Sequence, residues 1–127
     1  MKNETLPGPK NLYSDLPQLS RGEDFTELLR CRNVAVERIL SSDRVETVRY
    51  DQEQDEWVIL LEGRAVLEVA GEPVSLSAGD YIFLPAHTPH RVLTTSGEPR
   101  CIWLAVHVFP DRVPPVSGGC DDVRASQ

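Results

Sequence analysis

The stretch "GDYIFLPAHTPHRV", residues 79–92, decides how the rest of the chain is interpreted. Its apolar first half leads into a loop that Pro85 and Pro89 stiffen. The loop ends at His90, and His87 lies three residues earlier. A histidine where such a loop meets a strand is either a polar residue bonded to backbone or a metal ligand in a barrel. The choice depends on the partners that the rest of the chain offers.

The composition is that of one soluble domain. The chain has 127 residues, 40% of them hydrophobic and 26% charged, which suits a single core. The formal net charge of −7 argues against binding DNA or RNA, which requires a basic patch. No apolar run approaches the roughly 20 residues that span a membrane, and the N-terminus lacks the apolar region of a signal peptide. We therefore expect a cytoplasmic protein without nucleic-acid or membrane partners.

The cysteines Cys31, Cys101 and Cys120 fit no zinc-site spacing and are expected to be reduced thiols.

Short apolar segments separated by Gly, Pro, Ser and Asp predict many strands. Such spacing is typical of an all-β sandwich or barrel. The first segment, 23–31, also fits a helical face, and we assign it to a strand. The expected strands are 23–31, 33–40, 45–50, 56–63, 64–71, 73–77, 81–85, 90–95 and 101–109.

Proline- and glycine-rich ends frame this region. We expect an extended N-terminal arm over residues 1–21, a barrel over 22–110 and a flexible C-terminal tail over 111–127.

At residues 79–90 the chain resembles the cupin family. The second cupin motif is Gly, five residues, Pro, one residue, Gly, two residues and His. Gly79, Pro85 and His90 occupy these positions, while His87 replaces the second Gly. Thr94 stands where the family has Asn four residues after the His.

The first cupin motif is present only in part. It reads HxH, three or four residues, Glu, six residues and Gly, and Glu56 and Gly63 match its last two positions. Its histidines are absent from "VRYDQEQDEWVILLEG". The residues at their places form two alternative pairs, Tyr50 and Gln52 or Arg49 and Asp51. The resemblance covers about residues 34–109.

The resemblance implies a double-stranded β-helix, a jelly-roll-like barrel with extended N- and C-terminal arms. Cupins include dioxygenases, isomerases, epimerases, lyases, sugar binders and sensors, and they commonly pair as homodimers. The leading interpretation is a barrel that binds a small molecule and a divalent metal, Fe(II), Mn, Ni or Zn, as an isomerase, lyase or dioxygenase. The alternative is a non-catalytic ligand-binding or sensor cupin without metal. A purely structural domain is the third hypothesis.

Four side chains are the candidate metal ligands that this resemblance implies. His90 and Glu56 come from the two motifs. His107, in an otherwise apolar segment, or Gln52 would complete the site in place of the missing histidines, with Gln54 as an alternative amide.

Strand periodicity makes a prediction about direction. If His90 points into the barrel, Val92 and Thr94 do so as well, because alternate residues share a face. His87 is expected at the pocket mouth or on the surface.

Overall fold

The computed structural model describes residues 8–111 and 120–121. Over these residues the chain forms strands and no helix, so none of them makes a helix able to cross a membrane. The strands are β1 (Glu23–Cys31), β2 (Val34–Ser41), β3 (Asp55–Glu62), β4 (Arg64–Val69), β5 (Glu72–Ser77), β6 (Tyr81–Leu84), β7 (His90–Thr95), β8 (Cys101–Val108) and β9 (Cys120–Asp121).

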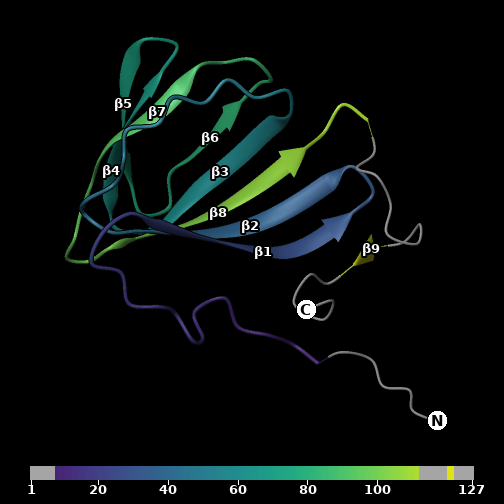
Figure 1. Cartoon of the computed structure of the whole chain (residues 1–127), viewed down its shortest axis with the longest axis horizontal. Coiled ribbons are helices and arrows are strands. Elements are labelled where there is room, and N and C mark those ends of the chain that lie inside the picture. The colour runs from purple at the N-terminus through teal and green to yellow at the C-terminus, as the bar shows by residue number, and fades with distance from the viewer. Residues whose placement is uncertain (1–7, 112–119, 122–127) are drawn as a thin grey trace.

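The described strands form two antiparallel sheets. The larger sheet has the order β6-β3-β8-β2-β1-β9 and the smaller β5-β4-β7. Figure 1 shows β3, β8, β2 and β1 side by side, with β4, β5 and β7 grouped at one side of them. The predicted all-β class with antiparallel strands is confirmed.

The core lies between the two sheets because alternate side chains of each strand point inward. Trp103 of β8 is 3% exposed, and its indole nitrogen donates to the hydroxyl of Ser41 at 3.0 Å. This bond satisfies the one polar atom of a large apolar side chain. The buried core cluster consists of Val58, Leu60, Ala65, Leu67, Leu76, Leu84, Cys101, Trp103 and Ala105.

One predicted strand is wrong and one ambiguous segment is settled. Residues 45–49 form no strand, and Tyr50 makes only an isolated bridge with His90. This segment has the alternating pattern of a strand, but no neighbouring strand lies beside it to form a ladder of hydrogen bonds. The segment 23–31 is a strand, with a register shift between Glu27 and Leu29.

The predicted N-terminal arm, residues 1–21, falls partly within the described residues. There it contacts β2 and the residue before β8, since Arg38 donates to the carbonyl of Leu12 at 2.9 Å and Arg100 to that of Pro17 at 2.6 Å.

The predicted C-terminal tail, residues 111–127, lies mostly outside the described residues. Its strand β9 pairs with β1 and brings position 120 opposite Cys31. Cys31 is disulfide-bonded, so the expectation of reduced thiols is wrong for this residue. Pairing of distant segments on neighbouring strands is not visible in cysteine spacing. Cys101 is a free, buried thiol.

Candidate functional site

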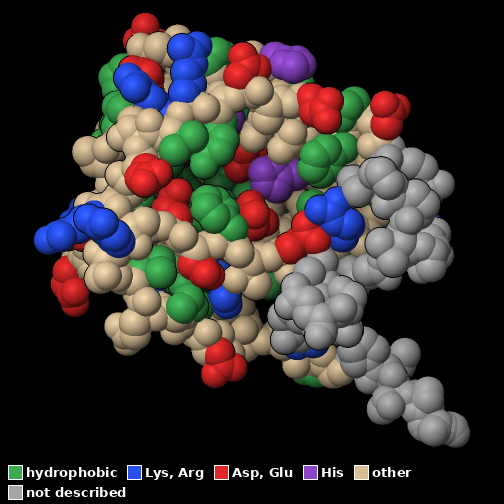
Figure 2. Space-filling model, in the orientation of Figure 1, with side chains coloured by type: hydrophobic (Ala, Val, Ile, Leu, Met, Phe, Trp, Pro, Cys, Tyr) green, Lys and Arg blue, Asp and Glu red, His purple; other side chains and the backbone are tan. Residues whose placement is uncertain are grey.

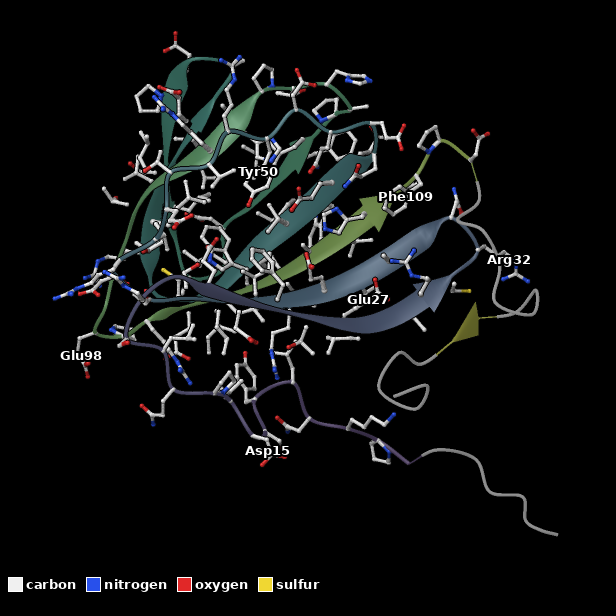
Figure 3. All side chains as sticks on the ribbon, viewed as in Figure 1. Asp15, Glu27, Arg32, Tyr50, Glu98 and Phe109 are labelled. Carbon is white, nitrogen blue, oxygen red and sulfur yellow. The ribbon has the colours of Figure 1, made fainter. Side chains whose placement is uncertain are left out.

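A cavity of about 410 Å³ opens between the two sheets. On the face shown in Figure 2, acidic, histidine and hydrophobic side chains surround a hollow. Figure 3 shows Tyr50, Glu27 and Phe109 around it, from the segment before β3, from β1 and from the residue that follows β8. The floor is apolar and includes Val58, Leu67, Leu84, Val92 and Trp103.

All four side chains predicted from the motifs line this cavity: His90, Glu56, His107 and Gln52. Their strands explain why. The ladder of β3 and β8 places Glu56 directly opposite His107, so both lie on the inner face. His90 begins β7 on the facing sheet, and Gln52 lies in the segment before β3. Their roles as metal ligands stay predictions.

Gln52, Glu56 and His90 form one cluster. The Gln52 amide donates to Glu56 Oε1 at 2.8 Å, and His90 Nε2 lies 3.8 Å from the same oxygen. His90 Nδ1 lies 2.9 Å from the carbonyl of Thr88, which can only accept, so Nδ1 carries a proton. Nε2 therefore faces the carboxylate. Tyr50 stacks on the His90 ring at 5.6 Å between centroids and pairs with it through the backbone.

Glu56 is a buried carboxylate that is only half satisfied by the protein. The residue is 8% exposed. Oε1 accepts from Gln52, while no donor among the described residues bonds Oε2. Oε2 is not itself fully buried, since Arg38 Nε is the only buried side-chain nitrogen or oxygen without a partner in the described part of the chain, so Oε2 is open to solvent or a ligand in the cavity.

His107 belongs to a second cluster. Its Nε2 lies 3.1 Å from Glu37 Oε1, and its Nδ1 lies 3.3 Å from the amide of Gln54. Burial lowers the pKa of His107, but the hydrogen bond to Glu37 and the charges of Glu56, Glu37 and Glu27 outweigh it. The net effect raises the pKa above its usual value. The carboxylates around His107 thus favour its protonated form.

Carboxylates gather on the β1–β2 side of the cavity. Glu27 of β1 lies directly opposite Glu37 of β2, a pairing of like charges that destabilises a sheet. Arg30 donates to Glu27 at 2.6 and 3.1 Å. The register shift between Glu27 and Leu29 lets residues three apart share the inner face.

Glu23 adds a fourth carboxylate, accepting a hydrogen bond from Ser41. Burial raises the pKa of Glu23, against that hydrogen bond, and the charge of Glu37 raises it further. Burial, together with the charges of Glu23, Glu37 and Glu56, also raises the pKa of Tyr50. Carboxylates thus outnumber the cationic side chains among the described residues that line the cavity.

Three of these acids were not among the predicted site residues: Glu23, Glu27 and Glu37. Glu37 did carry a signal, since it interrupts an apolar strand pattern. The position of Arg30 depends on the irregularity in β1, which periodicity does not show.

Comparison with known proteins identifies the family. A model of the Cupin domain matches residues 38–107. The chain belongs to the cupin family. This cupin is 37% identical to a protein of Ralstonia eutropha JMP134 provisionally named a mannose-6-phosphate isomerase, over 81% of this chain and 99% of that one, with a TM-score of 0.73.

Two other solved structures share the fold at lower identity. A cupin superfamily protein of Desulfitobacterium hafniense DCB-2 is 22% identical over 85% of this chain and 96% of that one, with a TM-score of 0.69. A salicylate 1,2-dioxygenase of Pseudaminobacter salicylatoxidans is 16% identical over 60% of this chain and 21% of that one, with a TM-score of 0.55. No curated protein matches the chain.

The residues do not fit the metal centre that cupin membership suggests. Across residues 8–111 and 120–121, no three His, Cys, Asp or Glu side chains are grouped so that they could hold a metal ion. Glu56 and His90 approach each other, but the His107 ring is engaged by Glu37 and Gln54. Gln52 supplies an amide, and its nitrogen is the atom that faces Glu56.

Two residues of the second motif do not face the cavity. The prediction for Thr94 is wrong, because a register shift between Val66 and Leu67 of β4 changes the parity after Val92 and turns Thr94 outward. His87 has an exposed side chain 3.1 Å from Asp51. Its positive φ of 61° shows why the family prefers Gly at this position.

Proposed function

We propose that this cupin binds a small organic molecule in the barrel cavity, with Gln52, Glu56 and His90 as its polar contacts. The main support is the Glu56 carboxylate, which has a hydrogen-bond donor in the described residues at only one oxygen and lines a cavity of about 410 Å³. That volume lies in the range of ligand pockets, about 300–1,000 Å³. Mostly apolar walls with a few convergent polar groups are typical of such pockets.

The polar cluster is built for contact with a ligand. Backbone bonds between Tyr50 and His90, at 2.7 and 2.9 Å, fix the segment before β3 against β7. The bond from His90 Nδ1 to Thr88 fixes the ring, and the amide of Gln52 holds Glu56. Pre-positioned polar groups lose little freedom when a ligand binds.

A metal-dependent activity is the second candidate. Its support is the 3.8 Å approach of His90 Nε2 to Glu56 Oε1, with Gln52 alongside. It also has support from cupin relatives named as an isomerase and a dioxygenase. A third imidazole or carboxylate would have to join this pair, so we derive no catalytic step from a metal.

A fragment screen on metal-free protein tests the proposal. Ligand-observed NMR on EDTA-treated protein should yield binders that Glu56→Gln weakens. The matched control is Glu68→Gln, because Glu68 binds Arg91 at 2.8 Å and does not line the cavity. Absence of any binder, or equal weakening by both variants, would contradict the proposal. Elemental analysis and a repeat with Mn, Fe(II), Ni or Zn added would distinguish the metal-dependent candidate.

We also propose that the protein pairs as a homodimer through the outer face of the larger sheet. Tyr81 and Phe83 of β6 are 65% and 55% exposed, and the ring of Tyr81 lies 5.4 Å from that of Trp57. Exposed aromatic groups on an edge strand are typical of a protein contact surface.

A further inference from the structure

We propose that the ligand of this cavity is an organic cation, an amine or quaternary ammonium compound, rather than a neutral or phosphorylated molecule. The inference rests on the proposed ligand-binding function and specifies the chemical class of its ligand.

The charges of the residues that line the cavity are the first argument for a cationic ligand. Four glutamates face the cavity: Glu23, Glu27, Glu37 and Glu56. Among the described lining residues Arg30 is the only Lys or Arg, and both its bonds go to Glu27. The His107 ring, hydrogen-bonded to Glu37, offsets part of the negative charge of that carboxylate. Within residues 8–111 no Lys or Arg forms an ion pair with Glu23 or Glu56, so a positively charged ligand would be attracted into the cavity.

The positions of glutamates on neighbouring strands are the second argument for a cationic ligand. Glu27 and Glu37 are direct cross-strand neighbours on the inner face, where like charges destabilise the sheet. Glu56 is 8% exposed and one of its oxygens has no donor in the described part of the chain. Arg30 and His107 offset part of the charge of Glu27 and Glu37, and the open oxygen of Glu56 on β3 supplies the carboxylate that a cationic group in the cavity could contact.

The aromatic rings at the cavity are the third argument for a cationic ligand. Phe25 is 51% exposed and Tyr50 is 38% exposed, and both line the cavity together with Phe109. The faces of such rings attract ammonium groups, and rings combined with carboxylates are the usual recognition site for organic cations.

Two other ligand classes fit less well. A phosphate group, as in the substrate for which the Ralstonia protein is named, needs guanidinium or ammonium donors, and Arg30 is already bound by Glu27. A divalent metal needs several donors around one point, and in the described residues no three such side chains are grouped. An organic cation needs only nearby carboxylates and ring faces.

Three probes with one aromatic body test the charge preference: 2-phenylethylamine, 2-phenylethanol and phenylacetate. Their affinities for EDTA-treated protein would be measured by isothermal titration calorimetry near pH 7.5. We expect the amine to bind at least about tenfold more tightly than the alcohol, and phenylacetate not to bind. Glu56→Gln should weaken the amine by about tenfold and leave the alcohol within about twofold, whereas Glu68→Gln should change neither.

The outcomes separate the two proposals. If the alcohol binds as tightly as the amine, or phenylacetate binds best, the cation inference is overturned and the ligand-binding function stands. If none of the three binds while the fragment screen gives hits that depend on Glu56, the cation inference also fails alone. If neither the probes nor the fragments bind, both proposals fail.

Discussion

Replacing Gly63 with Ala tests how the β3–β4 turn is built. Gly63 has a φ of +96°, and a Cβ there would lie 2.8 Å from Cys101 Sγ, 2.9 Å from the Arg100 carbonyl oxygen and 2.9 Å from Cys101 Cα. The positive φ alone costs about 1–2 kcal/mol for a residue with a Cβ. Two of the three contacts are backbone atoms of β8 or its approach, so the neighbours cannot simply rotate away. Overpacking of this kind costs about 1–3 kcal/mol.

Gly71→Ala is the matched control. Gly71 has a similar φ of +85° but no heavy atom within 4 Å of its would-be Cβ. Gly71→Ala should therefore lower the free energy of unfolding by about 1–2 kcal/mol, and Gly63→Ala by about 2–5 kcal/mol. In a chain of this size each kcal/mol corresponds to about 3–6 °C in Tm. Urea unfolding followed by tryptophan fluorescence gives both values, and equal losses within about 0.5 kcal/mol would refute the steric argument.

Three further predictions follow from the cavity and the outer face. The pKa of His107, measured by NMR, should exceed 6.5, and Glu37→Gln should lower it. Stabilisation by His107 is then complete below about pH 6.5 and is lost as the pH rises through the raised folded-state pKa; a stability gap between wild type and Glu37→Gln that grows with pH would contradict this. Trp103→Phe removes the bond to Ser41 and should cost about 1–3 kcal/mol in urea unfolding, and a loss under about 0.5 kcal/mol would show that the bond contributes little. The proposed homodimer should appear as a dimer of the wild-type protein in sedimentation velocity and as a monomer for Phe83→Glu, and a monomeric wild type or a dimeric variant would disprove the proposed interface.

The sequence allowed the strands with strong alternation to be predicted, and the second cupin motif with part of the first indicated the family. Residues 90–95 and 101–108 are strands as expected, because apolar alternation and flanking turn residues agree there. Residues 45–50 share the alternation but have no partner strand, a tertiary property that local pattern cannot contain. The outward turn of Thr94 has the same origin, since a register shift depends on the neighbouring strand.

The sequence indicated four residues that line the cavity, but not which of them contact one another. His90, Glu56, His107 and Gln52 all line the cavity, since motif spacing and strand parity determine which face a side chain takes. Which of them contact one another depends on strands distant in sequence. Glu37 of β2 engages the His107 ring, so Gln52 and not His107 joins Glu56 and His90 in one cluster.

The most direct test of ligand binding in the cavity uses the two tryptophans of the chain as matched probes. Trp103 lines the cavity, whereas Trp57 contacts Tyr81 on the outer face and does not line it. In ¹H–¹⁵N spectra recorded during titration with the best-binding fragment, the indole signal of Trp103 and the side-chain amide signal of Gln52 should shift together while the Trp57 indole stays in place. Shifts of Trp57 alone, or saturating binding that leaves Trp103 and Gln52 unchanged, would contradict the assignment of the cavity as the binding site.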